Sequence, residues 1–347
     1  MVRRDEPGER YVSARPGHPV AGLSATTTAS MAVRWTAVVA TLLVSAVFGY
    51  LALRDVRWAA TWRALGRTNY WWLLPTLATI GLWTVVRAAR WQAFFRREAR
   101  PDLGGLTKAT VLGLFFNNIL PARAGEAARV VALRSFSGTR VPESAATVVV
   151  ERLFDVLGLF ALLFVFSPWV PHVTWLRAAA FASIAAIGLV LALIVLGVYL
   201  ERRPARGHRF ASMLASLHDG LAALRSPGQA AIAVAWTLGS WLLLGLGFWF
   251  LSIGFHLGLS ALGGMLVAIA VGLSFLIPAA PAGLGVFEAA GLAVAGAYGI
   301  SSSKAIAYVL VLHAVNVIPY LVAGAFILAS SAPSLRREAI ERSSESI

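Results

Sequence analysis

Long apolar stretches dominate the pattern of hydrophobic and polar positions along this chain. A bilayer core about 30 Å thick needs about 20 apolar residues per helix, and several stretches reach that length. They lie at about residues 34–53, 70–88, 144–167, 176–200, 229–252 and 305–330. The second opens with Tyr70, Trp71 and Trp72, which suits the aromatic belt of a membrane interface. The pattern predicts an all-α fold: a polytopic transmembrane helical bundle with about six full spans.

Two further apolar regions are interrupted by proline and glycine. Residues 109–120 end at Pro121, and residues 261–280 are broken by Pro278 and Pro281 before a second apolar piece at 284–299. Proline removes a backbone donor and stops a helix. Broken backbone at membrane depth is tolerated only where protein or a water-filled cavity satisfies it. We expect 109–135 and 261–299 each to enter and leave on one side, or to cross as two half-length helices.

The order of these segments occurs twice along the chain. Span, span, broken segment and span make up residues 34–167, and the same order fills 176–330 with the opposite orientation. Inverted halves with Gly/Pro-interrupted segments at matching positions are the best sequence indication of a transport site. A bundle of eight to ten plain helices is the alternative.

The net charge of +14 is carried almost entirely by arginine. Arginines cluster in 87–108, in 201–225 and in the C-terminal tail, which the positive-inside rule assigns to the cytoplasm together with both termini. The loop 54–69 also carries arginines but would lie outside, so it does not follow this rule. We expect a multi-pass protein of the plasma membrane. Its basic loops favour anionic lipid headgroups over nucleic acid as partners.

The polar ends and the composition bound the remaining possibilities. Residues 1–30 predict a disordered cytoplasmic tail, although Met31 is an alternative start; 31–330 form the transmembrane domain and 331–347 a second cytoplasmic tail. Hydrophobic residues make up 58% of the chain and charged residues 13%, which leaves too little polar surface for a soluble fold. Without cysteine there is no disulfide or thiol nucleophile, and the scattered histidines form no metal-binding pair.

The unusual polar residues gather in the broken segments. Around Pro121 the sequence is rich in groups that bind phosphate, and around Pro281 small residues precede a glutamate. Arginine side chains and helix N-terminal N–H groups together can hold a phosphate; an interfacial salt bridge that closes a loop is the alternative. The candidate substrate-binding residues are Asn117, Asn118, Pro121, Arg123, Gly125, Glu126, Arg129, Pro281, Gly283, Gly285 and Glu288.

Two spans carry polar groups that are candidates for gating or proton coupling. In the third span Glu151 and Asp155 lie one turn apart, with Arg152 beside them. Intramembrane charges are costly and usually face a bundle interior, so these groups predict a proton or ion relay or a headgroup contact; a structural network is the alternative. On the last span His313 and Asn316 share a helical face. A lone histidine there serves helix packing at least as often as function.

These residues resemble the lysylphosphatidylglycerol synthase transmembrane region family, also called flippase-like or UPF0104 proteins, over about 35–330. The resemblance rests on three ordered motifs: Asn-Asn-x-Leu-Pro-x-Arg-x-Gly-Glu-x-x-Arg at 117–129, Glu-Arg-Leu-x-Asp at 151–155, and Pro-x-Gly-Leu-Gly-Val-x-Glu at 281–288. One departure is Ala282, where the family commonly has glycine.

The resemblance implies movement of a lipid with a charged or glycosylated headgroup between leaflets. Full-length lysylphosphatidylglycerol synthases add an aminoacyl-transferase domain, but only 17 residues follow position 330 here, so we expect no transferase activity. The absence of a Walker motif argues against ATP hydrolysis, and we expect no cofactor. The leading hypothesis is a lipid flippase for a phosphate-bearing lipid, aminoacylated or glycosylated.

Two hypotheses from other classes remain. One is an intramembrane enzyme acting on a lipid-linked sugar or aminoacyl group, with Glu151 and Asp155 as acid and base. The other is a non-transporting scaffold for a membrane glycosyltransferase partner in lipid-linked glycosylation.

Overall fold

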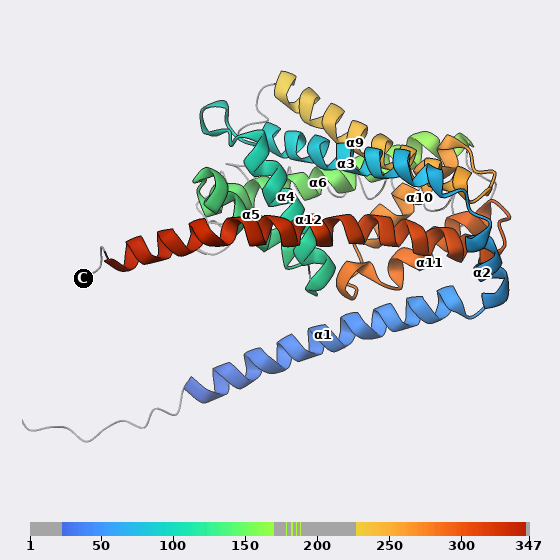
Figure 1. The fold of residues 1–347 in the computed structure, drawn as a ribbon, viewed down its shortest axis with the longest axis horizontal. Coiled ribbons are helices and arrows are strands. Elements are labelled where there is room, and N and C mark those ends of the chain that lie inside the picture. Colours follow the sequence, from blue (N-terminus) through green and yellow to red (C-terminus); the bar gives the residue numbers. More distant parts are fainter. Residues whose placement is uncertain are drawn as a thin grey trace, which may run out of the picture. The chain divides into compact units, whose positions relative to one another are not determined.

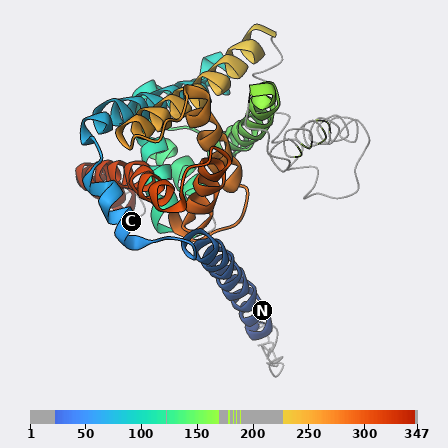
Figure 2. The same ribbon diagram turned by 90° about the vertical axis from the view of Figure 1, so that its right-hand side faces the viewer.

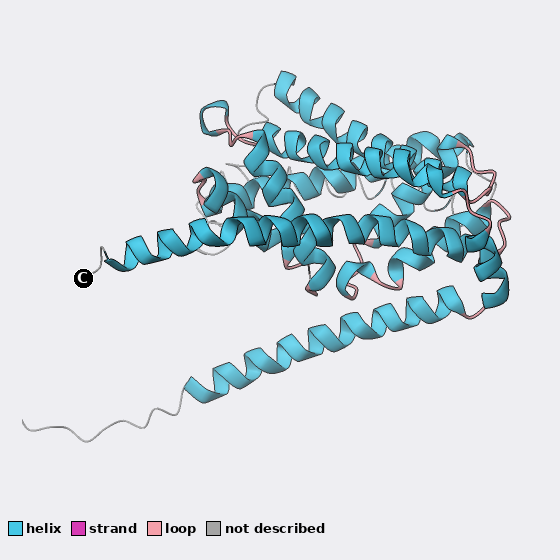
Figure 3. Cartoon of the chain, viewed as in Figure 1, coloured by secondary structure: helices cyan, strands magenta, loops and turns pink. Residues whose placement is uncertain are grey.

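The computed structural model describes residues 23–121, 123–169 and 227–344, with four isolated positions between 178 and 188. All regular structure within those ranges is helical (Figure 3), which confirms the predicted all-α fold for the part of the chain described. The predicted span 176–200, the arginine-rich stretch 201–225 and residues 1–22 lie outside the described residues. The chain divides into two compact units after Ala40, and the unit from Thr41 onward holds both hairpins and the sites described below.

Five of the predicted spans coincide with long helices: α1 (Leu23–Leu53), α3 (Leu73–Ala93), α6 (Val141–Phe166), α9 (Pro227–Gly254) and α12 (Ser302–Ser344) (Figure 1). Three described helices are long and apolar enough to cross a membrane, namely Tyr70–Ala93, Gly228–Gly254 and Ser302–Ser331. In Figures 1 and 2, α3 and α9 pack side by side along one flank of α12.

Helix α6 differs from those three in carrying charge at its centre. It is 26 residues long, enough for about 39 Å at 1.5 Å per residue. Glu151, Arg152 and Asp155 lie within it, so its sequence is less apolar than that of an ordinary lipid-facing span. Charged residues within such a helix face the bundle interior, and here they do.

The structure places helix in three segments that the sequence analysis assigned to a loop or to the tails. The loop 54–69 contains helix α2 (Trp58–Gly66), bent by 80° from α1. One face of α2 packs on the start of α12, where Thr61 Oγ1 donates to the backbone oxygen of Ser303 at 3.2 Å. Trp62, on the other face, is exposed; such two-sidedness suits an interfacial helix. The N-terminal tail is helical from Leu23 and the C-terminal tail to Ser344, because extending an existing helix costs far less than nucleating one.

The first broken segment folds as a helical hairpin of α4 (Leu103–Ile119) and α5 (Gly125–Ser137). At its base Asp102 caps α4 by accepting from the backbone N–H of Gly105 at 2.7 Å. The same carboxylate accepts from Ser137 Oγ, at the last residue of α5, at 3.0 Å. The segment therefore begins and ends at one place, as a re-entrant segment would, and the break at Pro121 is its tip.

The second broken segment is also a hairpin. It consists of α10 (Ala261–Ser274), a short 3-10 turn η5 (Pro281–Gly283) and α11 (Val286–Ala297). The start of α10 lies against the end of α11, because a Cβ on Gly263 of α10 would lie 3.4 Å from Cζ of Tyr298, which follows α11. Near the tip the rings of Phe275 and Phe287 lie 6.3 Å apart. This segment, too, begins and ends at one place.

The two hairpins start from opposite ends of the bundle. The backbone N–H of Asn69, ahead of α3, donates to the oxygen of Gly254, at the end of α9, so these two termini share an end. The first hairpin follows the far end of α3 and the second follows the end of α9. Turn η5, at the second tip, packs against α4 of the first hairpin. This arrangement agrees with the predicted opposite entry of the two segments; the inverted repeat and its orientation in a membrane stay predictions.

Candidate functional site

Charged side chains from three helices meet inside the bundle, beside the first hairpin. All are joined by ion pairs within 3.3 Å, and four arginines face three carboxylates. They are Arg87 and Arg90 of α3, Glu126 and Arg129 of α5, and Glu151, Arg152 and Asp155 of α6.

One half of this cluster links α3 to α6. Arg90 donates from Nη2 to Glu151 Oε1 at 2.8 Å and from Nη1 to Asp155 Oδ1 at 2.6 Å. Arg87 Nε lies 3.3 Å from the same Glu151 oxygen. One guanidinium thus bridges two carboxylates one helical turn apart, which fixes the register between α3 and α6.

The other half links α5 to α6. Arg129 Nη1 lies 2.9 Å from Glu151 Oε2, and Arg129 Nη2 lies 2.8 Å from Glu126 Oε2. Arg152 pairs with Glu126 and, through Nη1, with Asp155 Oδ2 at 3.1 Å. Six groups therefore form a closed ring of alternating charge. We call them the charge ring, in the order Glu126, Arg129, Glu151, Arg90, Asp155 and Arg152.

Burial makes this ring energetically consequential. The side chains of Glu151 and Arg90 are 0% and 1% exposed, and a buried ion is tolerated only with good partners, since removing one partner typically costs about 3–5 kcal/mol. Two arginines of the cluster also lie over tryptophan faces. Arg129 is 4.7 Å from the centroid of Trp91, and Arg87, which is outside the charge ring, is 5.1 Å from that of Trp83. Cation–π contacts of this kind add stability in desolvated sites.

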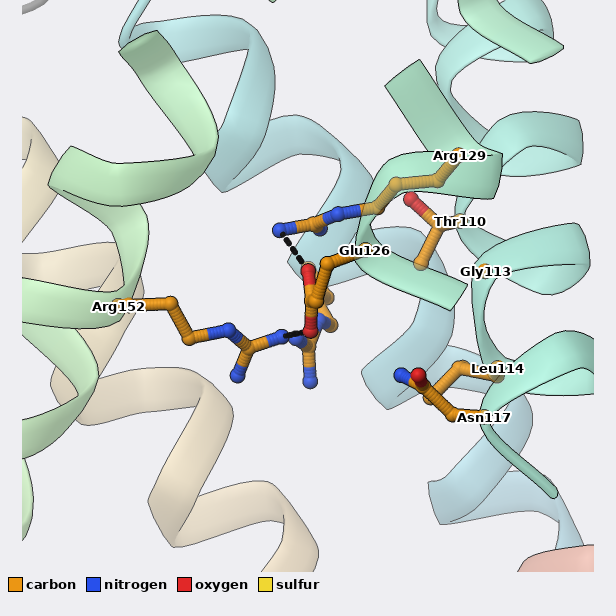
Figure 4. A pocket seen from close by; sticks show the side chains of 8 residues that line it. Thr110, Gly113, Leu114, Asn117, Glu126, Arg129 and Arg152 are labelled. Atoms are coloured by element: carbon orange, nitrogen blue, oxygen red, sulfur yellow. Dashed lines mark hydrogen bonds and ion pairs between the residues drawn. The ribbon is translucent and has the colours of Figure 1, made fainter. Parts of the chain in front are cut away.

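A pocket opens on one side of the ring, next to the first hairpin (Figure 4). The space between its side chains has room for no more than about one water molecule, and it reaches about 170 Å³ only when the open solvent at its mouth is included. Figure 4 shows Glu126 between Arg129 and Arg152 at the pocket wall. Its lining residues are Arg87, Thr110, Gly113, Leu114, Asn117, Glu126, Arg129 and Arg152.

The break of the first hairpin is shaped by Asn117 and Gly125. Asn117 Oδ1 accepts from the backbone N–H of Gly125 at 3.0 Å, so one N-terminal donor of α5 is already occupied. A Cβ on Gly125 would lie 2.0 Å from the backbone oxygen of Gly113, which explains why glycine is required there. The structure thus gives both residues a role in holding the hairpin closed, and Pro121 lies in the break that follows α4.

Arg123 stands apart from the ring. It takes a left-handed backbone conformation, with φ of 57°, at the tip of the hairpin. Its Nη2 is buried without a hydrogen-bond partner, and no ion pair of Arg123 occurs among the described residues. The Nδ2 donor of Asn118 is likewise buried without a hydrogen-bond partner among the described residues. These donors are available to an anion at the break.

The second hairpin carries a separate buried pair, Glu288 and His313. Glu288 Oε2 accepts from the backbone N–H of Gly285 at 2.7 Å, and Oε1 pairs with His313 Nδ1. His313 Nε2 lies 3.2 Å from the backbone oxygen of Ala282, and the Phe287 ring stacks on the imidazole with centroids 4.4 Å apart. Both imidazole nitrogens face oxygen atoms, an arrangement that a doubly protonated imidazolium satisfies as donor twice.

The turn below this pair has positive φ at three positions. Ala282 has φ of 59°, Gly283 of 75° and Gly285 of 85°. A side chain is strained in this conformation, which agrees with the glycine that the family resemblance implies in place of Ala282. A Cβ on Gly285 would lie 2.2 Å from the backbone oxygen of Ser45 on α1. Pro281 begins η5.

His313 and Asn316 lie three residues apart in α12, on a shared face, but no hydrogen bond joins them among the described residues. Asn316 Nδ2 donates to the oxygen of Leu312 in its own helix at 2.8 Å. Glu288 likewise lies outside the charge ring, because its described partners are Gly285 and His313. The predicted site residues therefore form two clusters, one at each hairpin.

Sequence reasoning missed Arg87 and Arg90. It placed them in a cytoplasmic basic loop, whereas both lie in α3 and are buried. The sequence did contain an indication, because the two arginines are three residues apart and would share a helical face. The structure shows that α3 continues to Ala93, beyond the predicted end of its span.

Comparison with known proteins now decides the family. Residues 38–324 match the family described as the lysylphosphatidylglycerol synthase TM region. The chain belongs to this family. It is also similar to UPF0104 membrane protein MJ1078 of Methanocaldococcus jannaschii, at 24% identity over 217 residues that cover 61% of this chain and 92% of that protein. The predicted family is confirmed, and with it an integral membrane protein with a lipid-related role.

Proposed function

We propose that this chain is a flippase that moves a phosphate-bearing lipid between the leaflets of the plasma membrane. The observation that carries the proposal is the arginine-rich pocket at the tip side of a broken helical hairpin inside a membrane bundle. A guanidinium recognises phosphate oxygens through paired N–H donors. The apolar surroundings strengthen that attraction, because their dielectric constant is low.

The cations of this region have distinct roles in the proposal. Arg123, which has no described ion pair, receives the headgroup at the break. Arg129 and Arg152, which line the pocket together with Arg87, hold the phosphate further in. In the structure Arg129 is 3% exposed and pairs with Glu126 and Glu151.

Coupling is assigned to the second hairpin. Glu288 and His313 form a buried acid–imidazole pair that clamps η5 to α12, and a gain or loss of a proton by either group would change the strength of this clamp. We propose that transport is driven by an ion gradient or runs downhill, with Glu288 and His313 sensing protons. Glu151 and Asp155, tied to arginines, hold the helices in register.

An intramembrane enzyme ranks lower. Glu151 and Asp155, the candidate acid and base, both accept from Arg90. Arginine neighbours favour the ionised carboxylate, whereas a general acid must carry a proton. A scaffold for a glycosyltransferase remains an outcome of the test below.

The test is leaflet exchange in proteoliposomes. Purified protein is reconstituted with fluorescent phosphatidylglycerol, aminoacyl-phosphatidylglycerol or a polyprenyl-phosphate sugar, and outer-leaflet label is quenched with and without a pH gradient. We expect protein-dependent exchange for one lipid, lost in Arg123→Ala and Arg152→Ala. Arg134→Ala is the matched control, because Arg134 is exposed on α5 outside the pocket. No exchange for any lipid, or equal loss in the control, would refute the proposal.

A further inference from the structure

We propose that Glu126 occupies, in the resting protein, the place that the phosphate of the lipid takes during transport. The lipid then binds by replacing this carboxylate between Arg129 and Arg152. The inference rests on the proposed function and adds how the site is kept closed when no lipid is bound. It also names the chemical class of the anion, a singly charged phosphodiester.

Glu126 is the only ring carboxylate that borders the pocket among the described residues. Its side chain is 20% exposed, against 0% for Glu151 and 7% for Asp155, and neither of those two lines the pocket. Glu126 is also the second residue of α5, directly after the break. It stands on the hairpin, whereas its partner Arg152 stands on the long helix α6. An anion entering the pocket therefore meets Glu126 first.

Glu126 fits its cations incompletely. Its Oε2 lies 2.8 Å from Arg129 Nη2, yet among the described residues neither atom has a hydrogen bond of acceptable geometry. The buried Nε donors of Arg129 and Arg152 also have no hydrogen-bond acceptor among the described residues. A carboxylate offers two oxygens, while a phosphodiester adds ester oxygens and a tetrahedral spread of acceptors. Buried donors without acceptors are costly, so an anion with more oxygens is favoured in this place.

The charges balance for one class of anion. Four arginines and three carboxylates give the cluster a formal charge of +1. When Glu126 swings out the remaining groups carry +2, and a singly charged phosphodiester restores +1. A phosphomonoester, with a charge near −2 at neutral pH, would make the net charge of the site lower than it is in the lipid-free protein. The exchange of Glu126 for a phosphodiester thus leaves the buried electrostatics as they were, which keeps its free-energy change small.

The experiment compares Glu126→Gln with wild type in two separate measurements. Binding of fluorescent phosphatidylglycerol in nanodiscs, and of inorganic phosphate in detergent, gives affinities; leaflet exchange gives transport. If Glu126 is swung out of the site in about a tenth of the lipid-free molecules, removing this competing carboxylate raises the affinity for the lipid about tenfold. Exchange slows, because no carboxylate displaces the lipid again. Glu143→Gln is the matched control, since Glu143 lies in the first turn of α6 outside the ring.

The outcomes separate this inference from the proposed function. Tighter phosphatidylglycerol binding in E126Q supports the inference even if wild type exchanges no lipid, in which case the flippase proposal fails alone. Unchanged or weaker binding in E126Q, with wild-type exchange intact, overturns the inference alone. Tighter binding of inorganic phosphate without tighter lipid binding overturns the phosphodiester assignment.

A second comparison serves if E126Q does not fold. Arg152→Gln removes a cation of the site, and the double variant E126Q/R152Q removes one charge of each sign. The double variant should bind phosphatidylglycerol more tightly than R152Q, because the competing carboxylate is gone. Equal binding by the two would overturn the inference.

Discussion

Arg90 offers the sharpest test of whether the charge ring holds the helices together. Replacing it with methionine keeps much of the side-chain volume but removes the bridge to Glu151 at 2.8 Å and to Asp155 at 2.6 Å. Glu151 retains Arg87 and Arg129, while Asp155 retains only Arg152 among its described partners. Because these carboxylates are buried, we expect Arg90→Met to destabilise the protein by about 3–5 kcal/mol.

The magnitude is checked by a double-mutant cycle. Purified variants in detergent are unfolded by denaturant, and free energies of unfolding are compared for R90M, Asp155→Leu and the double variant. Apolar replacement of a whole buried pair is often neutral or stabilising, so the double variant should be less destabilised than the sum of the single variants by at least about 1 kcal/mol. Arg63→Ala, on exposed α2, is the control and should change stability by less than about 0.5 kcal/mol.

The refuting result is specific. If R90M unfolds within about 1 kcal/mol of wild type, or if the two single effects simply add, the bridge does not carry the stability assigned to it. The ring would then be an arrangement that water or lipid replaces without cost, and its roles in register and transport would both lose their basis.

Three further predictions concern the hairpins. Gly125→Ala should lower the melting temperature and leaflet exchange together, because its Cβ would meet a backbone oxygen of α4 at 2.0 Å, whereas Gly81→Ala meets nothing within 4 Å and should be silent; equal effects would refute the close packing. Ala282→Gly should raise the free energy of unfolding by up to about 1 kcal/mol, since it relieves left-handed strain, and a loss measured by denaturation would contradict this. Asp102→Ala should cost about 1 kcal/mol by removing the cap of α4. Hydrogen bonds from the Gly105 backbone N–H and from Ser137 lower the pKa of the Asp102 carboxyl. The stability that this carboxylate contributes is therefore present above its unfolded pKa and is lost as pH falls through its lower folded pKa. Hydrogen exchange at the start of α4, followed as a function of pH, measures this loss.

Much of the fold follows from the sequence through one rule, that a bilayer requires long apolar helices with satisfied backbones. The stretches 70–88 and 229–252 became α3 and α9, close to their expected bounds. The breaks were also predictable, because Pro121 comes just after the end of α4 and Pro281 begins η5.

The partners of the charges were decided only by tertiary structure. An arginine at the end of a span and an arginine in a loop look alike in sequence, so Arg87 and Arg90 were placed with the cytoplasmic loop. Their carboxylate partners lie on α6, 65 residues further along the chain from Arg90 in the case of Asp155. Helix packing decides which groups come close in space when they are so far apart in sequence, and ion pairs form only between groups that lie close in space. For the same reason sequence alone did not pair Glu288 with His313, whereas the packing of α11 against α12 brings the two side chains together.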